Sequence, residues 1–184
     1  VAALVEQPAE RLELLLRVAS IREVHLGDAD GAIARYRMAL ELDAQNGVAL
    51  RALDRLYEAQ SRWPDLAEVL RREVALPDLS PDDALGVRYR LAEVLEHRLG
   101  DIDGALAVHR EILEVQADHP GTVGALESMF SRGVKREETF ALLEPIYRDG
   151  QQWEKLADIQ ARSLEFVTDP AARLQVMHGI ADLV

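Results

Sequence analysis

The sequence predicts an all-α fold, a right-handed α-solenoid of antiparallel helix pairs with about ten helices, and two observations lead to it. Apolar residues recur at spacings of three and four along almost the whole chain, as in Leu12, Leu15 and Ala19, and no stretch sustains the alternation of a strand. Residues 27–34 also return in similar form as residues 100–107, 73 positions later. Self-similarity at a fixed spacing is typical of repeat proteins, in which each unit buries its apolar face against its neighbours.

Proline, glycine and aspartate divide the first part of the chain into helices. Pro8 suits the first turn of a helix, because the N–H that proline lacks would have no partner there. The Gly27-Asp28 pair ends that helix, and Asp28 or Asp30 can cap the next one. The expected helices of this part cover residues 8–26, about 28–42, 47–60 and 64–76.

A short linker at residues 76–81 precedes the second part, where the helical pattern restarts. The expected helices there cover residues 82–99, 103–116, 120–131, 137–149, 153–167 and 170–184. Taken in pairs, the helices form units at about residues 8–43, 46–76, 82–116, 120–149 and 153–184, within one repeat domain over residues 1–184. Because the chain opens without methionine and stops in helical pattern, we expect a fragment of a longer repeat array.

A second internal match has a different spacing, which predicts that the repeats are not uniform. The set Leu53, Tyr57, Trp63 and Leu66 corresponds to residues of the same kind 90 positions later. The change from 73 to 90 is about the length of one helix with its turn. We therefore expect an additional helix in the second copy, between about residues 120 and 139.

The stretch from residue 15 to residue 46 resembles a tetratricopeptide repeat: a helix, a Gly-Asp turn, and then a second helix with a characteristic pattern. The residues that carry the resemblance are Gly27, Asp28, Ala32, Tyr36, Ala39, Leu40, Glu41, Leu42 and Asp43. Residues 100–115 repeat the pattern, and the rest of the chain follows it in weakening form. The first helices are one residue longer before their glycine than the family pattern. The resemblance implies a protein–protein interaction domain with no catalytic activity.

In that family, partners bind on the concave face, which is lined by the first helix of each pair. The resemblance places the following residues on or near that face: Arg51, Arg55, Glu58, Tyr89, Glu93, Glu96, Ser128 and Arg132. The family's clamp for a peptide carboxylate needs lysine and asparagine, and Glu93 and Glu96 stand there instead. A C-terminal carboxylate is therefore not the expected ligand, and the mixed face suits a partner that carries both signs of charge.

Composition limits the classes of partner. The chain of 184 residues has a formal net charge of −12, whereas binding to a nucleic-acid backbone needs clustered Lys and Arg. The same charge argues against docking on anionic lipid, and no apolar run approaches the roughly 20 residues of a membrane span. The acidity is explained by solubility alone or by a preference for basic partners. Since the chain has no cysteine and no visible signal segment, the compartment is open, and a cytoplasmic location is the favoured expectation.

Acidic residues and histidines have explanations that need no metal ion. Asp28-x-Asp30-Gly31 is superficially similar to a calcium loop, but the first ligand position would fall on a leucine, so helix capping is the better account. His25 and His97 occupy equivalent places near helix C-termini, where the helix dipole favours positive charge. We expect no metal site and no cofactor.

Three large side chains carry structural expectations. Trp63 and Trp153 are equivalent in two repeats, which favours packing between helices over a role as exposed binding anchors. His109 stands where the repeat pattern has a core aromatic residue, so we expect it to be packed or half-buried.

No phosphate loop, serine elbow or cleft-forming pair of carboxylates is evident, so we expect no enzymatic activity. The leading prediction is a noncatalytic scaffold that binds a protein or peptide partner, of unknown identity, on the concave face. The alternative is an architectural spacer that positions other domains of a longer chain. The amphipathic last helix also predicts self-association through the end of the array.

Overall fold

The computed structural model describes residues 7–183, and within this range the chain is helical throughout, with short turns between the helices. The α-helices are α1 (Pro8–Val24), α2 (Ala29–Leu42), α3 (Gly47–Ala59), α4 (Trp63–Val74), α5 (Pro81–Val94), α6 (Ile102–Val115), α7 (Pro120–Ser131), α8 (Arg136–Asp149), α9 (Trp153–Ser163) and α10 (Pro170–Leu183). These ten helices of the described range confirm the all-α prediction and the order of the predicted helices. The predicted end at residue 184 lies outside the described residues.

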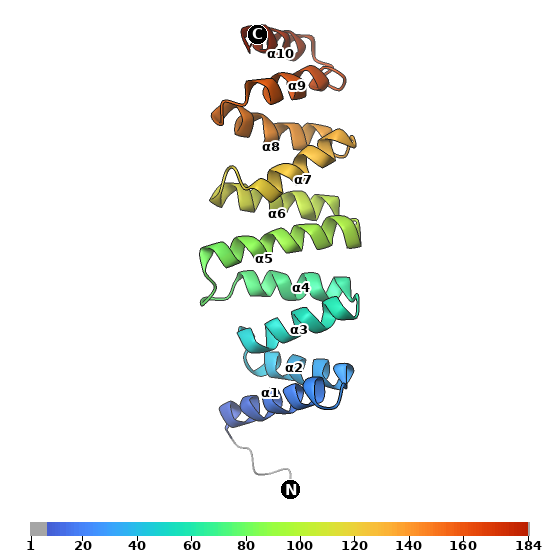
Figure 1. Cartoon of the computed structure of the whole chain (residues 1–184), viewed down its shortest axis with the longest axis vertical. Helices are drawn as coiled ribbons and strands as arrows, with labels where there is room; N and C mark the ends of the chain where they lie inside the picture. Colours follow the sequence, from blue (N-terminus) through green and yellow to red (C-terminus); the bar gives the residue numbers. More distant parts are fainter. Residues whose placement is uncertain (1–6, 184) are drawn as a thin grey trace. The chain divides into compact units, whose positions relative to one another are not determined.

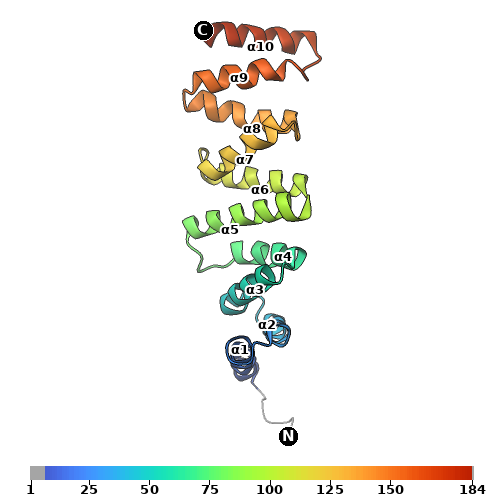
Figure 2. The same cartoon turned by 45° about the vertical axis from the view of Figure 1, so that its right-hand side comes forward.

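The chain divides into two compact units, one that ends at Val108 and one that begins at His109, and α6 crosses the boundary. In the first unit, each of the helices α1 to α4 packs against the next one along the chain (Figure 1). In the second unit, α7 to α10 pack in the same sequential way (Figure 2). The helix α7 stands where the 90-residue spacing predicted an additional helix. One right-handed solenoid over the whole chain stays a prediction.

Small residues allow the helices of the first unit to approach closely. Ala19 of α1 and Ala32 of α2 are fully buried, and Ala92 of α5 and Ala105 of α6 are buried at the corresponding places 73 positions later. Tyr36 of α2, which is 3% exposed, is the large residue of the same pattern. The methyl side chain of alanine is too small to hold two backbones apart, so the repeat pattern is a packing pattern.

The 73-residue spacing corresponds to one kind of turn, in which a glycine and an aspartate join two helices. Gly27 and Gly100 adopt left-handed backbone angles, with φ of 62° and 68°. After the first of them, the Asp28 carboxylate accepts a hydrogen bond from the Gly31 amide at 2.9 Å, as the capping interpretation predicted. Asp101 caps α6 with the same geometry, again at 2.9 Å.

The 90-residue spacing corresponds to a second kind of turn, which uses no glycine at its left-handed position. Ser61 and Gln151, 90 positions apart, have φ of 56° and 55°. In each turn, the amide of the next residue donates to the carbonyl of a buried tyrosine, Tyr57 or Tyr147, at 2.8 Å. The two spacings therefore distinguish two types of helix pair.

One predicted helix differs in its last turn. The sequence predicts a single helix over residues 82–99, but α5 ends at Val94 and Leu95–Leu99 form a π-helical turn. The same widening begins in α1, where the Leu26 amide donates to the Ile21 carbonyl, five residues back. A π turn holds one residue more than an α turn, so it accommodates the extra residue before each glycine.

The end of α9 also differs from the prediction. The helix ends at Ser163, not at residue 167, because residues 164–166 form a turn in which the Phe166 amide donates to the Ser163 carbonyl. None of the helices described in residues 7–183 combines the length and the apolar character that crossing a bilayer requires.

Candidate functional site

Side chains of the odd-numbered helices meet directly across the first unit. Arg55 of α3 donates to the carboxylate of Glu23 in α1 at 3.0 Å. Arg90 of α5 donates to both carboxylate oxygens of Asp54 in α3, at 2.8 and 2.9 Å, and to Glu58 at 3.1 Å. These ion pairs define one surface, which we call the α1–α3–α5 face.

Three of the predicted binding residues lie on this face, all on α3. The side chains of Arg51, Arg55 and Glu58 are 51, 63 and 57% exposed. Arg51 is the most loosely paired of them, because its guanidinium lies 3.9 Å from the exposed carboxylate of Asp78. An exposed ion pair at this distance contributes little to stability, so this arginine can change partners at low cost.

The three predicted binding residues between Gly86 and Gly100 differ in how far they are exposed. Glu93 lines a shallow pocket together with Arg90 and Glu58. Tyr89 is half-buried, and burial, followed by the charges of Glu93 and Glu96, raises the pKa of its hydroxyl. Glu96 itself is only 8% exposed and lies in the π-helical turn, so its carboxylate does not extend from the surface as the sequence predicted.

Ser128 and Arg132 belong to the second unit and are not part of the ion-pair surface defined by α1, α3 and α5. Both are exposed at the end of α7, and the Arg132 side chain donates to the Ser128 carbonyl at 3.4 Å. The bond joins two residues one helical turn apart, so it covers the last carbonyls of α7. A role for these two residues in binding stays a prediction.

Sequence reasoning missed the central residues of the α1–α3–α5 face. Asp54 is 8% exposed, and its carboxylate accepts hydrogen bonds from both terminal nitrogens of Arg90. This hydrogen bonding is the main cause of the raised pKa of Arg90. The two residues are 36 positions apart, and the family pattern pointed to Tyr89 instead. The only signal in the sequence was adjacency to predicted binding residues, because Arg90 directly follows Tyr89 and Asp54 directly precedes Arg55.

A pocket of about 480 Å³ opens beside this ion pair, between α3, the end of α4 and the start of α5. Its lining residues are Arg51, Asp54, Glu73, Leu76, Leu79, Asp82, Asp83, Gly86, Val87 and Arg90. Glu73, in the last turn of α4, is 4% exposed, and its Oε1 atom has no hydrogen-bond partner among the described residues. Burial, and then the charge of Asp54, raise the pKa of Glu73 to about 7.

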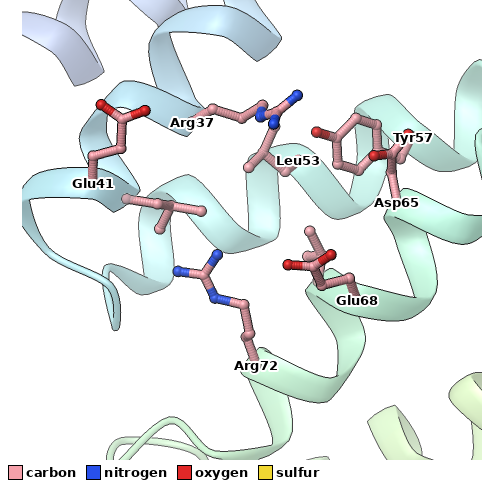
Figure 3. Close-up of a pocket in the computed structure, with 9 residues that line it drawn as sticks. Arg37, Glu41, Leu53, Tyr57, Asp65, Glu68 and Arg72 are labelled. Carbon is pink, nitrogen blue, oxygen red and sulfur yellow. The ribbon is translucent and has the colours of Figure 1, made fainter.

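A second kind of groove lies between α2 and α4, with α3 at its base. Figure 3 shows Arg37 and Asp65 beside Tyr57 in this groove, with Glu68 and Arg72 of α4 further along it. Its volume is about 210 Å³. The groove is narrow and polar, which suits a packing seam between helices better than a ligand site.

The second unit contains the equivalent groove, with lining residues 90 positions later and a volume of about 370 Å³. There Tyr147 donates its hydroxyl to Glu127 at 2.5 Å, and Lys155 donates to the same carboxylate at 2.8 Å. Glu127 and Lys155 stand at the positions of Arg37 and Asp65, so the two charges are exchanged at this pair of positions. Such an exchange keeps one positive and one negative charge at the two positions.

The tryptophans differ from the packing prediction in one case. Trp63 is half-buried, with the guanidinium of Arg98 4.7 Å from its ring centroid. Trp153 is 44% exposed, so its predicted place in the core is wrong. It is the first residue of α9 and precedes the first buried residue of that helix, Leu156, by nearly a turn.

His109 is 1% exposed, which confirms the prediction of a packed side chain. Its Nδ1 lies 3.4 Å from the hydroxyl of Thr122, and the same hydroxyl is 3.1 Å from Nδ1 of His119. His119 also caps α7 by accepting from the Thr122 amide at 3.1 Å. These contacts hold the start of α7, and they give both histidines a structural role.

Comparison with known families agrees with this architecture. Residues 49–83, which span most of α3, all of α4 and the start of α5, match the tetratricopeptide repeat. No curated protein matches the sequence. This match supports a tetratricopeptide-like repeat protein, and the matched residues include most of the lining of the pocket that contains Glu73, which we call the Glu73 pocket.

Proposed function

We propose that this protein is a noncatalytic scaffold that binds a protein segment on the α1–α3–α5 face. Tetratricopeptide repeats generally mediate protein–protein interaction, and the matched residues 49–83 supply the α3 part of this face. The observation that carries the proposal is a set of two ion pairs that join three helices, Arg55 of α3 with Glu23 of α1 and Arg90 of α5 with Glu58 of α3.

Such a network suits an extended or helical partner that lies across the helices. Each exposed pair is worth roughly 0–1 kcal/mol, so a partner can exchange these contacts for its own at little cost. Binding would then depend on several modest contacts along the face, not on one deep pocket. Arg51 and Arg55 are the cations that a partner's carboxylates would reach first, because both are more than half exposed.

The proposal is tested by capture of partners on the immobilised chain. The face variant combines Arg51→Glu, Arg55→Glu and Tyr89→Ala. The control variant combines Arg37→Glu and Arg71→Glu, which reverse two exposed charges on α2 and α4 and change the net charge equally.

A partner that binds the native chain and the control, but is lost with the face variant, supports the proposal. A partner that binds all three proteins equally contradicts it, because the bound surface then lies elsewhere. If no protein is captured in several salt conditions, the alternative of an architectural spacer becomes the better account. Circular dichroism of each variant must show the native helix content, so that loss of binding is not loss of folding.

A further inference from the structure

We propose that the pocket between α3, α4 and α5 receives a lysine or arginine side chain of the bound partner, with the carboxylate of Glu73 as its main acceptor. The inference rests on the proposed function, because the pocket opens beside the α1–α3–α5 face. It adds a chemical class of ligand, a basic side chain, to a face whose partner is otherwise defined only as protein.

The first argument is the unused carboxylate. A buried polar atom without a hydrogen bond is costly, and such atoms are rare in folded proteins. Glu73 is 4% exposed and its Oε1 has no partner among the described residues, although two arginines line the same pocket. An acceptor that is buried, ionisable and unused marks a place where a donor from outside can bind.

The second argument is that the neighbouring arginines already have other partners. Both terminal nitrogens of Arg90 are bound to Asp54, and one of them also reaches Glu58. The guanidinium of Arg51 lies beside Asp78. These contacts engage both guanidinium groups, and neither of them donates a hydrogen bond to Oε1 of Glu73.

The third argument is the charge balance of the lining. Four carboxylates line the pocket, those of Asp54, Glu73, Asp82 and Asp83, against the two guanidinium groups of Arg51 and Arg90. Asp78 adds a further negative charge beside Arg51. Since four lining carboxylates stand against two lining cations, an added cation improves the balance.

The fourth argument is the shape. A volume of about 480 Å³ accommodates an ammonium or guanidinium group with its methylene stem. Leu76, Leu79 and Val87 supply apolar walls for the stem. Gly86 also lines the pocket, and a Cβ atom built on it would meet nothing within 4 Å, so the α5 side of the pocket is open.

The test titrates the full chain with two small probes, N-acetyl-lysine methylamide and N-acetyl-arginine methylamide. Binding is measured from the amide NMR signals of residues 73–90. The uncharged probe is N-acetyl-citrulline methylamide, which has nearly the shape of the arginine probe. The variant is Glu73→Gln, which keeps the shape of the side chain and removes its charge. The matched control is Glu68→Gln, which removes an exposed carboxylate from the same helix.

We expect at least one cationic probe to give saturable shifts with the native chain and with Glu68→Gln, and to bind Glu73→Gln about tenfold more weakly or worse. Citrulline should give no saturable shifts. Equal binding to Glu73→Gln, equal binding of citrulline, or the absence of saturable shifts with both cations would each overturn the inference.

The affinity should also depend on pH, because a cation binds the ionised form of Glu73. Burial raises the pKa of this carboxyl to about 7, and the facing groups are Asp54 and Arg51 on α3, Arg90, Asp82 and Asp83 on α5, and Asp78 in the linker. Between pH 8 and pH 6, the affinity of the native chain should fall about tenfold, with proton release on binding. In Glu73→Gln the same change of pH should have little effect, and an equal fall would contradict the role of Glu73.

The same variant separates this inference from the proposed function. If a captured partner is lost with the α1–α3–α5 face variant but fully kept by Glu73→Gln, the pocket inference is wrong and the scaffold function stands. If the partner is kept by both, the proposed binding face itself is wrong.

Discussion

Replacing Glu73 by glutamine should stabilise the protein in alkaline solution, although it removes a charged side chain. The native carboxyl is 4% exposed, and one of its oxygens has no hydrogen-bond partner among the described residues. Ionising such a group in the folded state means placing a charge where it is less well solvated than in the unfolded chain. Glutamine has almost the same shape and is never charged, so the variant avoids that cost at every pH.

The size of the effect follows from the pKa of Glu73, which rises from 4.5 in its ordinary environment to about 7 in the folded protein. Between these two pH values, the folded state binds more protons than the unfolded state, so the free energy of unfolding falls as the pH rises. The loss is complete once the pH exceeds the folded value. It corresponds to about 3 kcal/mol, since a tenfold change in proton affinity is worth about 1.4 kcal/mol.

The measurement is urea unfolding of the native chain and of Glu73→Gln at pH 5 and at pH 8. Trp63 begins the same helix, so its fluorescence in a Trp153→Phe background reports the unfolding of this region. We expect the variant to be similar to the native chain at pH 5 and more stable at pH 8 by up to about 3 kcal/mol. The matched control, Glu68→Gln, should show the same difference from the native chain at both pH values, because this carboxylate is exposed.

An equal stability difference for Glu73→Gln at pH 5 and pH 8 would refute the reasoning, because it would mean that the carboxyl titrates as if solvated. A variant that is less stable than the native chain at pH 8 would refute it more strongly. In that case the ionised carboxylate makes a favourable interaction in the folded state.

Three further predictions concern stability, and all are measured by urea unfolding. Arg90→Ala should cost about 3 kcal/mol, because it leaves the buried carboxylate of Asp54 without its partner, whereas Arg55→Ala should cost under about 1 kcal/mol; equal losses would contradict this ranking. Asp101→Ala should cost about 1 kcal/mol by removing the cap of α6, and Asp101→Asn should restore most of it, so a fully destabilised asparagine variant would argue against capping. Tyr147→Phe should cost about 1–2 kcal/mol, because its hydroxyl donates to a carboxylate of α7, and a loss near zero would show that water replaces this bond.

Much of the fold could be predicted from local features. The helices follow from the three- and four-residue spacing of apolar residues, and their boundaries follow from residues such as Pro8, Gly27 and Asp28. These signals act over a few residues, so they do not depend on the rest of the fold. The two internal spacings also predicted the additional helix α7, because a repeat copies the residues that pack between neighbouring helices.

The candidate site was predicted only in part. The family pattern selected Arg51, Arg55 and Glu58, which are exposed on α3, and their role in binding stays a prediction. The pattern selected Glu96 for the same binding face, but the π-helical turn changes the rotation of the chain after Val94, and Glu96 is buried. A spacing of 3.6 residues per turn does not describe a turn that holds one residue more.

By itself, the sequence determined the helices, their caps, their order and the repeat family, because these depend on short-range periodicity and on the backbone preferences of glycine, proline and aspartate. Only the tertiary structure decided which charges meet. Arg90 binds Asp54 across 36 residues, and Glu73 is buried because α3 and α5 pack on either side of the end of α4. Burial and pairing of a charge depend on residues that are distant in the chain. The physical character of the α1–α3–α5 face and of the Glu73 pocket therefore came from the packing of the helices.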